Sequence, residues 1–177
     1  MTTLAARKRG ITVFRAADSV DLANTDFMTR PGTMPEGFQS VRDEMGAGAA
    51  AGAEAKVLVR DAGGFSLVYL WFKPNYPLLR HSHDVDCMYY VISGSAVMGR
   101  QTLRAGDSFF VPARAPYQYN AGPDGVEVLE VRHGSEQFDI EVVPDPPRWR
   151  AMVEVVKANQ TAWSELSTSP TFAANGG

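Results

Sequence analysis

Short runs of β-branched and aromatic residues, separated by Gly, Pro, Asn or Asp, dominate the chain from Lys56 to His133. These runs are KVLVRD, FSLVYLWF, CMYYVISG, SAVMG, DSFFVP, YQYNAG and VEVLEVRH. Val, Ile, Tyr, Phe and Trp favour strands, and the separating residues favour the turns between them. Several short strands at close spacing predict an all-β sandwich or barrel over residues 56–143, and they argue against alternating β and α units.

The pattern changes on both sides of this β-rich region. After Asp145, a Pro that suits a first helical turn precedes apolar residues at helical spacing, which are Trp149, Met152, Val153 and Val156. We therefore expect a C-terminal helix and tail over residues 144–177. Residues 1–55 are expected to form an N-terminal extension that packs on the barrel. The extension ends in MGAGAAAGAEA (45–55), whose low complexity and glycines predict a flexible connector or mobile surface loop.

Composition narrows the classes of protein. The 177 residues are 45% apolar and 21% charged, with a net charge of -3. This balance is typical of a globular domain, and it provides no basic field to attract nucleic acid. No apolar run approaches the roughly 20 residues of a membrane span, so no membrane partner is expected. The single cysteine cannot form an internal disulfide, and the first ten residues lack the apolar segment of a signal peptide. These features predict a cytoplasmic protein.

The candidate site lies in the stretch RHSHDVDCMYYV. His81, His83 and Cys87 all occupy odd positions, so a strand running through them would place the three side chains on one face. Two imidazoles and a thiol that converge can hold a transition metal and leave a position open for water or substrate. Cys87 has a second interpretation, because a free cysteine on a barrel strand is commonly a small buried hydrophobe.

Residues 74–120 resemble the two-part motif of the cupin superfamily. The first part is H-x-H, a Glu four or five positions later and a Gly that opens a hairpin; this chain has His81, His83, Cys87 and Gly94 there. The second part is a Gly, five residues, a Pro, then Gly-x-x-His and a following Asn. At those places this chain has Gly106, Pro112, Arg114, Tyr117 and Asn120. The resemblance implies a cupin-like double-stranded β-helix, also called a jelly-roll barrel, and a homodimer.

The resemblance also implies a divalent metal inside the barrel, which the family holds with three His and one Glu. Here Cys87 replaces the Glu and Tyr117 replaces the third His. We expect His81, His83 and Cys87 to hold a divalent transition metal, which would be Zn, Fe, Cu or Ni. Tyr117 is expected to act as a general acid or base, a role that lyase members of the family give to a tyrosine. Tyr117 could instead ligate the metal or simply fill the barrel.

Other polar residues leave the composition of the site open. Asp86 could supply the missing carboxylate if its loop is irregular, although turn formation and solvation are the preferred interpretation. His133 matches no ligand position of the family. Several charged residues could anchor a carboxylate substrate or form ordinary surface pairs; they are Arg80, Arg100, Arg104, Arg114, Glu130 and Arg132.

These expectations together predict a metal-dependent cupin enzyme that acts on a small organic substrate. The resemblance allows a dioxygenase, a lyase or an isomerase. The alternative is a non-catalytic module, in which a pocket with a degenerate metal site binds or senses a small molecule.

Overall fold

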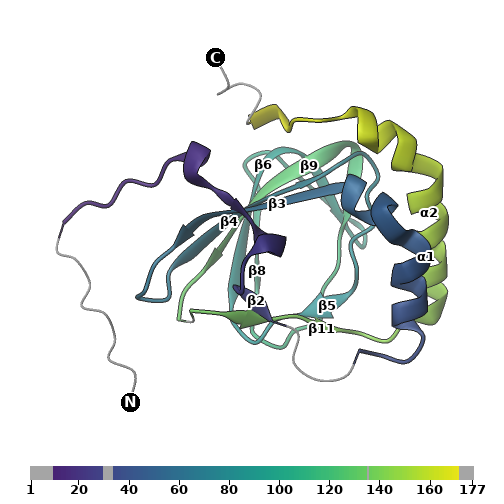
Figure 1. Ribbon diagram of the computed structural model, residues 1–177, viewed down its shortest axis with the longest axis horizontal. Helices are drawn as coiled ribbons and strands as arrows, with labels where there is room; N and C mark the ends of the chain where they lie inside the picture. The colour runs from purple at the N-terminus through teal and green to yellow at the C-terminus, as the bar shows by residue number, and fades with distance from the viewer. Residues whose placement is uncertain (1–9, 30–33, 135, 172–177) are drawn as a thin grey trace.

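One seven-stranded antiparallel sheet curves around to form most of the barrel wall (Figure 1). The computed structural model describes residues 10–29, 34–134 and 136–171. The strand order is β1-β3-β4-β9-β6-β7, and β8 also pairs with β6. The strands are β1 (Val20–Asp21), β3 (Ala53–Arg60), β4 (Ser66–Phe72), β6 (Cys87–Met98), β7 (Gln101–Arg104), β8 (Ser108–Val111) and β9 (Asn120–Arg132). This arrangement confirms the predicted all-β fold class.

Two short ladders complete the wall near the candidate site. β5 (His81–Ser82) pairs antiparallel with β11 (Glu141–Val142), and β2 (Met28–Thr29) pairs in parallel with β10 (Phe138–Asp139). The extension that leads to β2 also contains two 3-10 turns, Ala16–Asp18 and Leu22–Asn24. Phe27 of this extension packs against Val68 and Phe138, so the extension covers apolar surface of the barrel.

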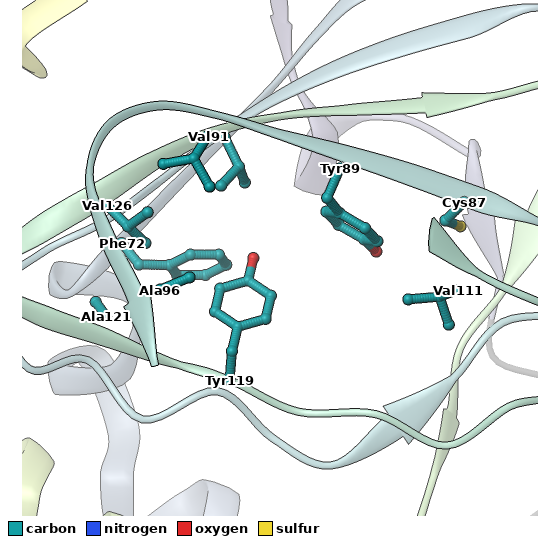
Figure 2. Close-up of a cluster of buried hydrophobic side chains, with 10 residues drawn as sticks. Phe72, Cys87, Tyr89, Val91, Ala96, Val111, Tyr119, Ala121 and Val126 are labelled. Atoms are coloured by element: carbon teal, nitrogen blue, oxygen red, sulfur yellow. The ribbon is translucent and has the colours of Figure 1, made fainter. Parts of the chain in front are cut away.

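Side chains alternate between the inside and the outside of the barrel, as a period of two requires. The inner face contributes one buried apolar cluster, shown in Figure 2, that contains Phe72, Cys87, Tyr89, Val91, Ala96, Val111, Tyr119, Ala121, Val126 and Val128. His81 and His83 are also buried, but so is Ser82 between them, and the strand expected to run through residues 81–87 is interrupted between β5 and β6. The outer face exposes Met88, Tyr90 and Phe110. The homodimer implied by the resemblance stays a prediction.

The motif glycines behave differently from one another. Gly106 has a φ of 95° and lies in the turn between β7 and β8, as expected. Gly94 does not open a hairpin, because β6 continues through it to Met98 with a shift of register. A Cβ atom at Gly94 would lie 2.1 Å from the carbonyl oxygen of Gly125, so glycine permits the close approach of β6 and β9. Arg114, which stands where the family has Gly, adopts a left-handed φ of 63°.

The predicted C-terminal helix is present as α2 (Pro146–Glu165). Asp145 caps its first turn by accepting a hydrogen bond from the backbone N–H of Arg148 at 3.2 Å, and prolines fill the first helical positions. The four apolar residues that predicted this helix, Trp149, Met152, Val153 and Val156, are all buried. No helix within the described ranges combines the length and apolar character that a membrane crossing needs.

The prediction of a flexible connector over residues 45–55 was wrong. Most of this segment belongs to α1 (Phe38–Ala51), which lies beside α2 on one side of the barrel (Figure 1), and β3 begins at Ala53. Alanine favours the helix, while Gly46 breaks its regularity with a φ of 50°. The other glycines permit close packing: a Cβ atom at Gly48 would lie 2.9 Å from Val156 Cγ1, and one at Gly52 would lie 2.6 Å from Trp163 Cε3.

Candidate active site

Three of the sequence-predicted residues meet inside the barrel. His81 belongs to β5, His83 follows it directly, and Tyr117 is paired with His81 through an isolated β-bridge. All three line a cavity of about 280 Å³. The histidine side chains are only 6% and 5% exposed, so the cavity holds them away from bulk water.

Backbone carbonyl groups fix the orientation of both imidazole rings. His81 Nδ1 lies 2.7 Å from the carbonyl oxygen of Leu79, and His83 Nδ1 lies 2.5 Å from that of Asp139. Because a carbonyl oxygen only accepts hydrogen bonds, Nδ1 of each ring carries the proton. Burial lowers the pKa of both histidines, for His81 to about 4, so both rings are neutral near pH 7. The Nε2 atoms therefore carry free lone pairs.

A continuous chain of polar contacts starts at one of these lone pairs. His81 Nε2 lies 2.9 Å from the Tyr117 hydroxyl, which contacts the Tyr89 hydroxyl. Tyr89 in turn donates a hydrogen bond to Glu130 Oε1. Glu130 and Tyr89 come from the neighbouring strands β9 and β6, at directly opposed register positions. His83 Nε2 faces the same carboxylate at 3.9 Å, beyond hydrogen-bonding distance.

The polar chain from His81 to Glu130 contains three contacts: His81 with Tyr117, Tyr117 with Tyr89, and Tyr89 with Glu130. Only two protons, one on each phenol, are present to form hydrogen bonds in these three contacts. Burial raises the pKa of Tyr89 and Tyr117 well above the usual phenol value, so each keeps its single proton. Burial is the largest single influence and acts to raise the pKa of Glu130, but the charge of Arg132, together with the hydrogen bonds from Tyr89 and Arg132 and the nearby His83, outweighs it, so the carboxyl pKa is lowered. The chain of neutral His81, two phenols and an ionised Glu130 therefore has room for one more proton.

Glu130 and Arg132 form a buried ion pair on the inner face of β9. Arg132 Nη2 donates to Glu130 Oε1, and both side chains are about 95% buried or more. The guanidinium also lies over the Phe138 ring, 3.7 Å from its centroid. Burial of the two charges together leaves the interior with no net charge from this pair.

Two buried donors of the cavity wall have no hydrogen-bond partner among the described residues. They are the Tyr119 hydroxyl and Arg132 Nη1. Figure 2 shows the Tyr119 hydroxyl pointing into the space between Phe72 and Tyr89. A buried donor without a partner costs free energy, so these two groups favour a ligand that carries an acceptor oxygen.

Cys87 is inside the barrel but does not join the two histidines in a metal-ligand group. Its thiol donates to the carbonyl oxygen of Val85 at 3.6 Å, and its Sγ atom accepts from Arg132 Nε at 3.1 Å. Burial raises the pKa of this thiol to about 11, which disfavours the thiolate that a metal needs. Among the described residues, no three His, Cys, Asp or Glu side chains form a group that could hold a metal ion. This arrangement does not fit a metal on His81, His83 and Cys87.

The remaining candidates lie outside the cavity. Asp86 is exposed, as its preferred interpretation expected, and it accepts a hydrogen bond from the backbone N–H of Ala113, 27 positions away, at 2.8 Å. His133 is exposed at the end of β9. Arg114 pairs with Asp139 and Glu141 near the surface. Arg80, Arg100 and Arg104 are exposed as well.

Four residues of the site were not recognised from the sequence as a group. The sequence does not distinguish Tyr89 and Tyr119 from the many other aromatic residues of the β-rich region, and it leaves Glu130 and Arg132 among six charged residues with two possible roles. A usable signal was present in the run VEVLEVRH. Val126 and Val128 face inward, so a period of two also turns positions 130 and 132 into the barrel.

No protein-family model matches the sequence, and no curated protein matches it. Solved structures do resemble the chain. An RmlC-like cupin from Shewanella frigidimarina is 26% identical, with 48% of this chain and 78% of that chain covered and a TM-score of 0.43. KdgF from Halomonas sp. is 20% identical, with coverage of 48% and 81% and a TM-score of 0.43. The polyketide cyclase RemF from Streptomyces resistomycificus is 22% identical, with coverage of 53% and 72% and a TM-score of 0.44.

The chain is a β-barrel protein with a cupin-like fold. The antiparallel sheet closes around His81, His83 and Tyr117, and Arg114 adopts the backbone conformation that the motif assigns to glycine. The predicted cupin-like fold is therefore confirmed.

Proposed function

We propose that the barrel cavity is the active site of an isomerase- or lyase-type enzyme that moves a proton beside the carbonyl group of a small organic substrate. The proton count along the chain from His81 to Glu130 carries this proposal. Two phenolic protons serve three contacts, so a third proton taken from a substrate completes the hydrogen bonds of the chain. Proton transfer by side chains positioned in this way is general acid–base catalysis.

The reaction begins when the Tyr117 oxygen takes a proton from the carbon beside the carbonyl group. At the same time the phenolic proton of Tyr117 passes to His81 Nε2. The C–H electron pair becomes the C=C bond of an enolate, and the π pair of the carbonyl moves to its oxygen. His81 then returns the proton through Tyr117, either to another carbon in an isomerisation or to a departing group that leaves with its bonding pair in an elimination.

The two unpartnered donors support the same chemistry. Tyr119 and Arg132 Nη1 supply hydrogen bonds to an acceptor oxygen, and they become stronger as that oxygen gains negative charge. Glu130 neutralises Arg132 but also stabilises a positive charge on the chain, because Tyr89 links it to Tyr117. A neutral carbonyl compound suits these surroundings better than a carboxylate, which would bring an unbalanced charge into the barrel.

The experiment that tests this function is hydrogen–deuterium exchange of 2-butanone in D₂O, followed by proton NMR. The wild-type protein is expected to exchange the protons beside the carbonyl group faster than buffer alone. Tyr117→Phe removes the oxygen that takes the proton, and it is expected to slow the exchange about a hundredfold or more. Tyr90→Phe is the matched control, because Tyr90 lies on the outer face of β6 and is exposed.

Two outcomes would contradict the proposal. Exchange that survives Tyr117→Phe would place the base elsewhere. Binding of 2-butanone without any exchange above the buffer rate would favour the non-catalytic alternative, in which the barrel only binds a small molecule. Far-ultraviolet circular dichroism and thermal unfolding of each variant separate these outcomes from loss of the fold.

A second candidate function is the metal-dependent enzyme that the sequence predicted. It is favoured by one observation: both histidines donate Nδ1–H to a carbonyl and leave Nε2 unprotonated, the tautomer found in metal-ligating histidines. The proposed metal is a divalent transition metal, Zn, Fe, Cu or Ni. Elemental mass spectrometry of the wild type, His83→Ala and Cys87→Ala tests it. If the wild type holds one metal per chain and only His83→Ala loses it, the histidines are metal ligands and Cys87 is a packing residue.

A further inference from the structure

A second cavity lies next to the barrel cavity, under the pair of helices. Its volume is about 410 Å³, and its wall includes residues of α1, of α2 and of the segment 77–79 before β5. Figure 1 shows the two helices together on one side of the barrel. We call it the helix cavity. It is within the range of roughly 300–1,000 Å³ in which proteins bind small organic ligands.

The wall of the helix cavity is almost entirely apolar. It contains four methionines, Met28, Met34, Met45 and Met152, together with Phe38 and several Ala, Leu, Val and Ile residues. Its ionisable lining residues are His81, Tyr76 and Arg42, and Arg42 is exposed. Methionine side chains are flexible and polarisable, so they adapt to aliphatic ligands of different shapes. The helix cavity is therefore suited to a hydrocarbon group.

Five residues line both cavities: Met28, Tyr76, Leu78, His81 and Ile140. His81 is the end of the proton-accepting chain, so one side of the reaction centre borders the apolar helix cavity. The wall of the barrel cavity also carries the unpartnered donors, Tyr119 and Arg132 Nη1. A cavity with unpartnered polar groups and an apolar cavity thus share the same imidazole in their walls.

We infer that the substrate is a carbonyl compound with an aliphatic arm, whose carbonyl group lies in the barrel cavity and whose arm lies in the helix cavity. This inference rests on the proposed function and adds the substrate class to it. Each buried methylene group is expected to improve binding about fourfold at 25 °C, until the helix cavity is filled.

The test is a series of methyl ketones, 2-butanone, 2-hexanone and 2-octanone, titrated into the wild type by isothermal calorimetry. Affinity is expected to rise with chain length. Ala49→Phe places a ring in the helix cavity, because Ala49 on α1 lines it. This variant is expected to abolish the gain for 2-octanone while binding 2-butanone as the wild type does. Ala50→Phe, from an exposed position that also lines the cavity, repeats the test if Ala49→Phe does not fold.

Ala47→Phe is the matched control, because Ala47 is an exposed residue of α1 that does not line the cavity. Equal affinity for all three ketones in the wild type, or a gain for 2-octanone that persists in both cavity variants, would overturn the inference. In that case, exchange of 2-butanone would still test the proposed function by itself. If 2-octanone binds but no ketone exchanges its protons, the proposed function fails, and the assignment of a reacting carbonyl substrate fails with it.

Discussion

Strand β9 carries two buried carboxylates, Glu127 and Glu130, which differ in whether each of their contacts has a proton to form a hydrogen bond. Each is at least 95% buried, and each has a lowered pKa because its partners outweigh the effect of burial. Glu127 accepts hydrogen bonds from the hydroxyls of Tyr69 and Ser93 and from the backbone N–H of Thr171. These three contacts have three protons, whereas the chain from His81 to Glu130 has two protons for three contacts.

The difference separates a structural carboxylate from one suited to chemistry. Glu127 lies on the outer side of β9, where its contact with Thr171 attaches the segment after α2 to the barrel. Its contacts are complete without a ligand. Glu130 faces a cavity whose wall also carries donors without partners. Glu127 and Glu130 are thus alike in being buried and in having a lowered pKa. They differ in that only Glu130 faces a cavity with unsatisfied hydrogen-bond donors.

The largest expected effect comes from removing the cavity carboxylate. Glu130→Ala leaves the Arg132 guanidinium buried without its ion-pair partner, which is expected to cost about 3–5 kcal/mol of stability. Urea unfolding measures the loss. The double variant Glu130→Leu/Arg132→Met is expected to regain most of the stability. It is not expected to regain proton exchange of 2-butanone. Recovery of exchange in the double variant would show that this ion pair has no part in the reaction.

Removing the outer carboxylate is expected to have a smaller and purely structural effect. Glu127→Ala leaves two buried hydroxyls and one backbone N–H without their acceptor, at a cost of about 1–3 kcal/mol. Amide hydrogen exchange of residues 166–171 is expected to accelerate, because Thr171 loses its contact. Exchange of 2-butanone protons, corrected for the folded fraction, is expected to match the wild type. A large loss of this activity would remove the distinction between the two carboxylates.

A pair of tyrosines sharpens the comparison with a still smaller change. Tyr119→Phe removes a buried hydroxyl that has no partner in the described part of the chain, so stability is expected to rise, by about 1 kcal/mol, because the cost of the unsatisfied group is removed. Its affinity for 2-butanone is expected to fall about twofold to tenfold, the range of one hydrogen bond. Tyr69→Phe is the counterpart on the Glu127 side, and it is expected to lower stability by about 1 kcal/mol without changing that affinity.

The same contrast explains which parts of the site can be predicted from the sequence alone. The prediction that His81, His83 and Cys87 lie inside the barrel was correct, but no single strand runs through them: β5 ends at Ser82, which is buried as well, and β6 begins at Cys87. Sequence could not show that Cys87 contacts Arg132, since that contact joins residues 45 positions apart through the pairing of β6 with β9. Glu127 and Glu130 likewise differ only in what the fold brings to each side of β9.

Glycine was the other source of error. The glycines of residues 45–55 indicated flexibility by composition, yet Gly48 and Gly52 lie where a Cβ atom would collide with side chains of α2. Gly94 indicated a hairpin through the resemblance, yet it relieves a collision with Gly125 inside a continuous strand. In both places glycine is required by close approach, which depends on a partner distant in the sequence.

The pH dependence of the Glu127 contribution tests one carboxylate without removing its contacts. The pKa of Glu127 is lower in the folded protein than the unfolded value of about 4.3. As the pH falls, the unfolded chain therefore binds a proton first. The contribution of this carboxylate is complete well above that value and is lost on acidification, by at most about 1.4 kcal/mol per pH unit.

Urea unfolding of the wild type and Glu127→Gln between pH 7 and pH 3 measures this contribution as a difference. The difference is expected to stay constant down to about pH 5.5 and to shrink below that, since only the wild type has a carboxyl to protonate at this position. The buried histidines also lower stability in acid, because their pKa values are depressed and the unfolded chain protonates them first. Both proteins contain them, so their effect cancels. A difference that stayed constant to pH 3 would mean that the hydrogen bonds to Glu127 do not favour its ionised form.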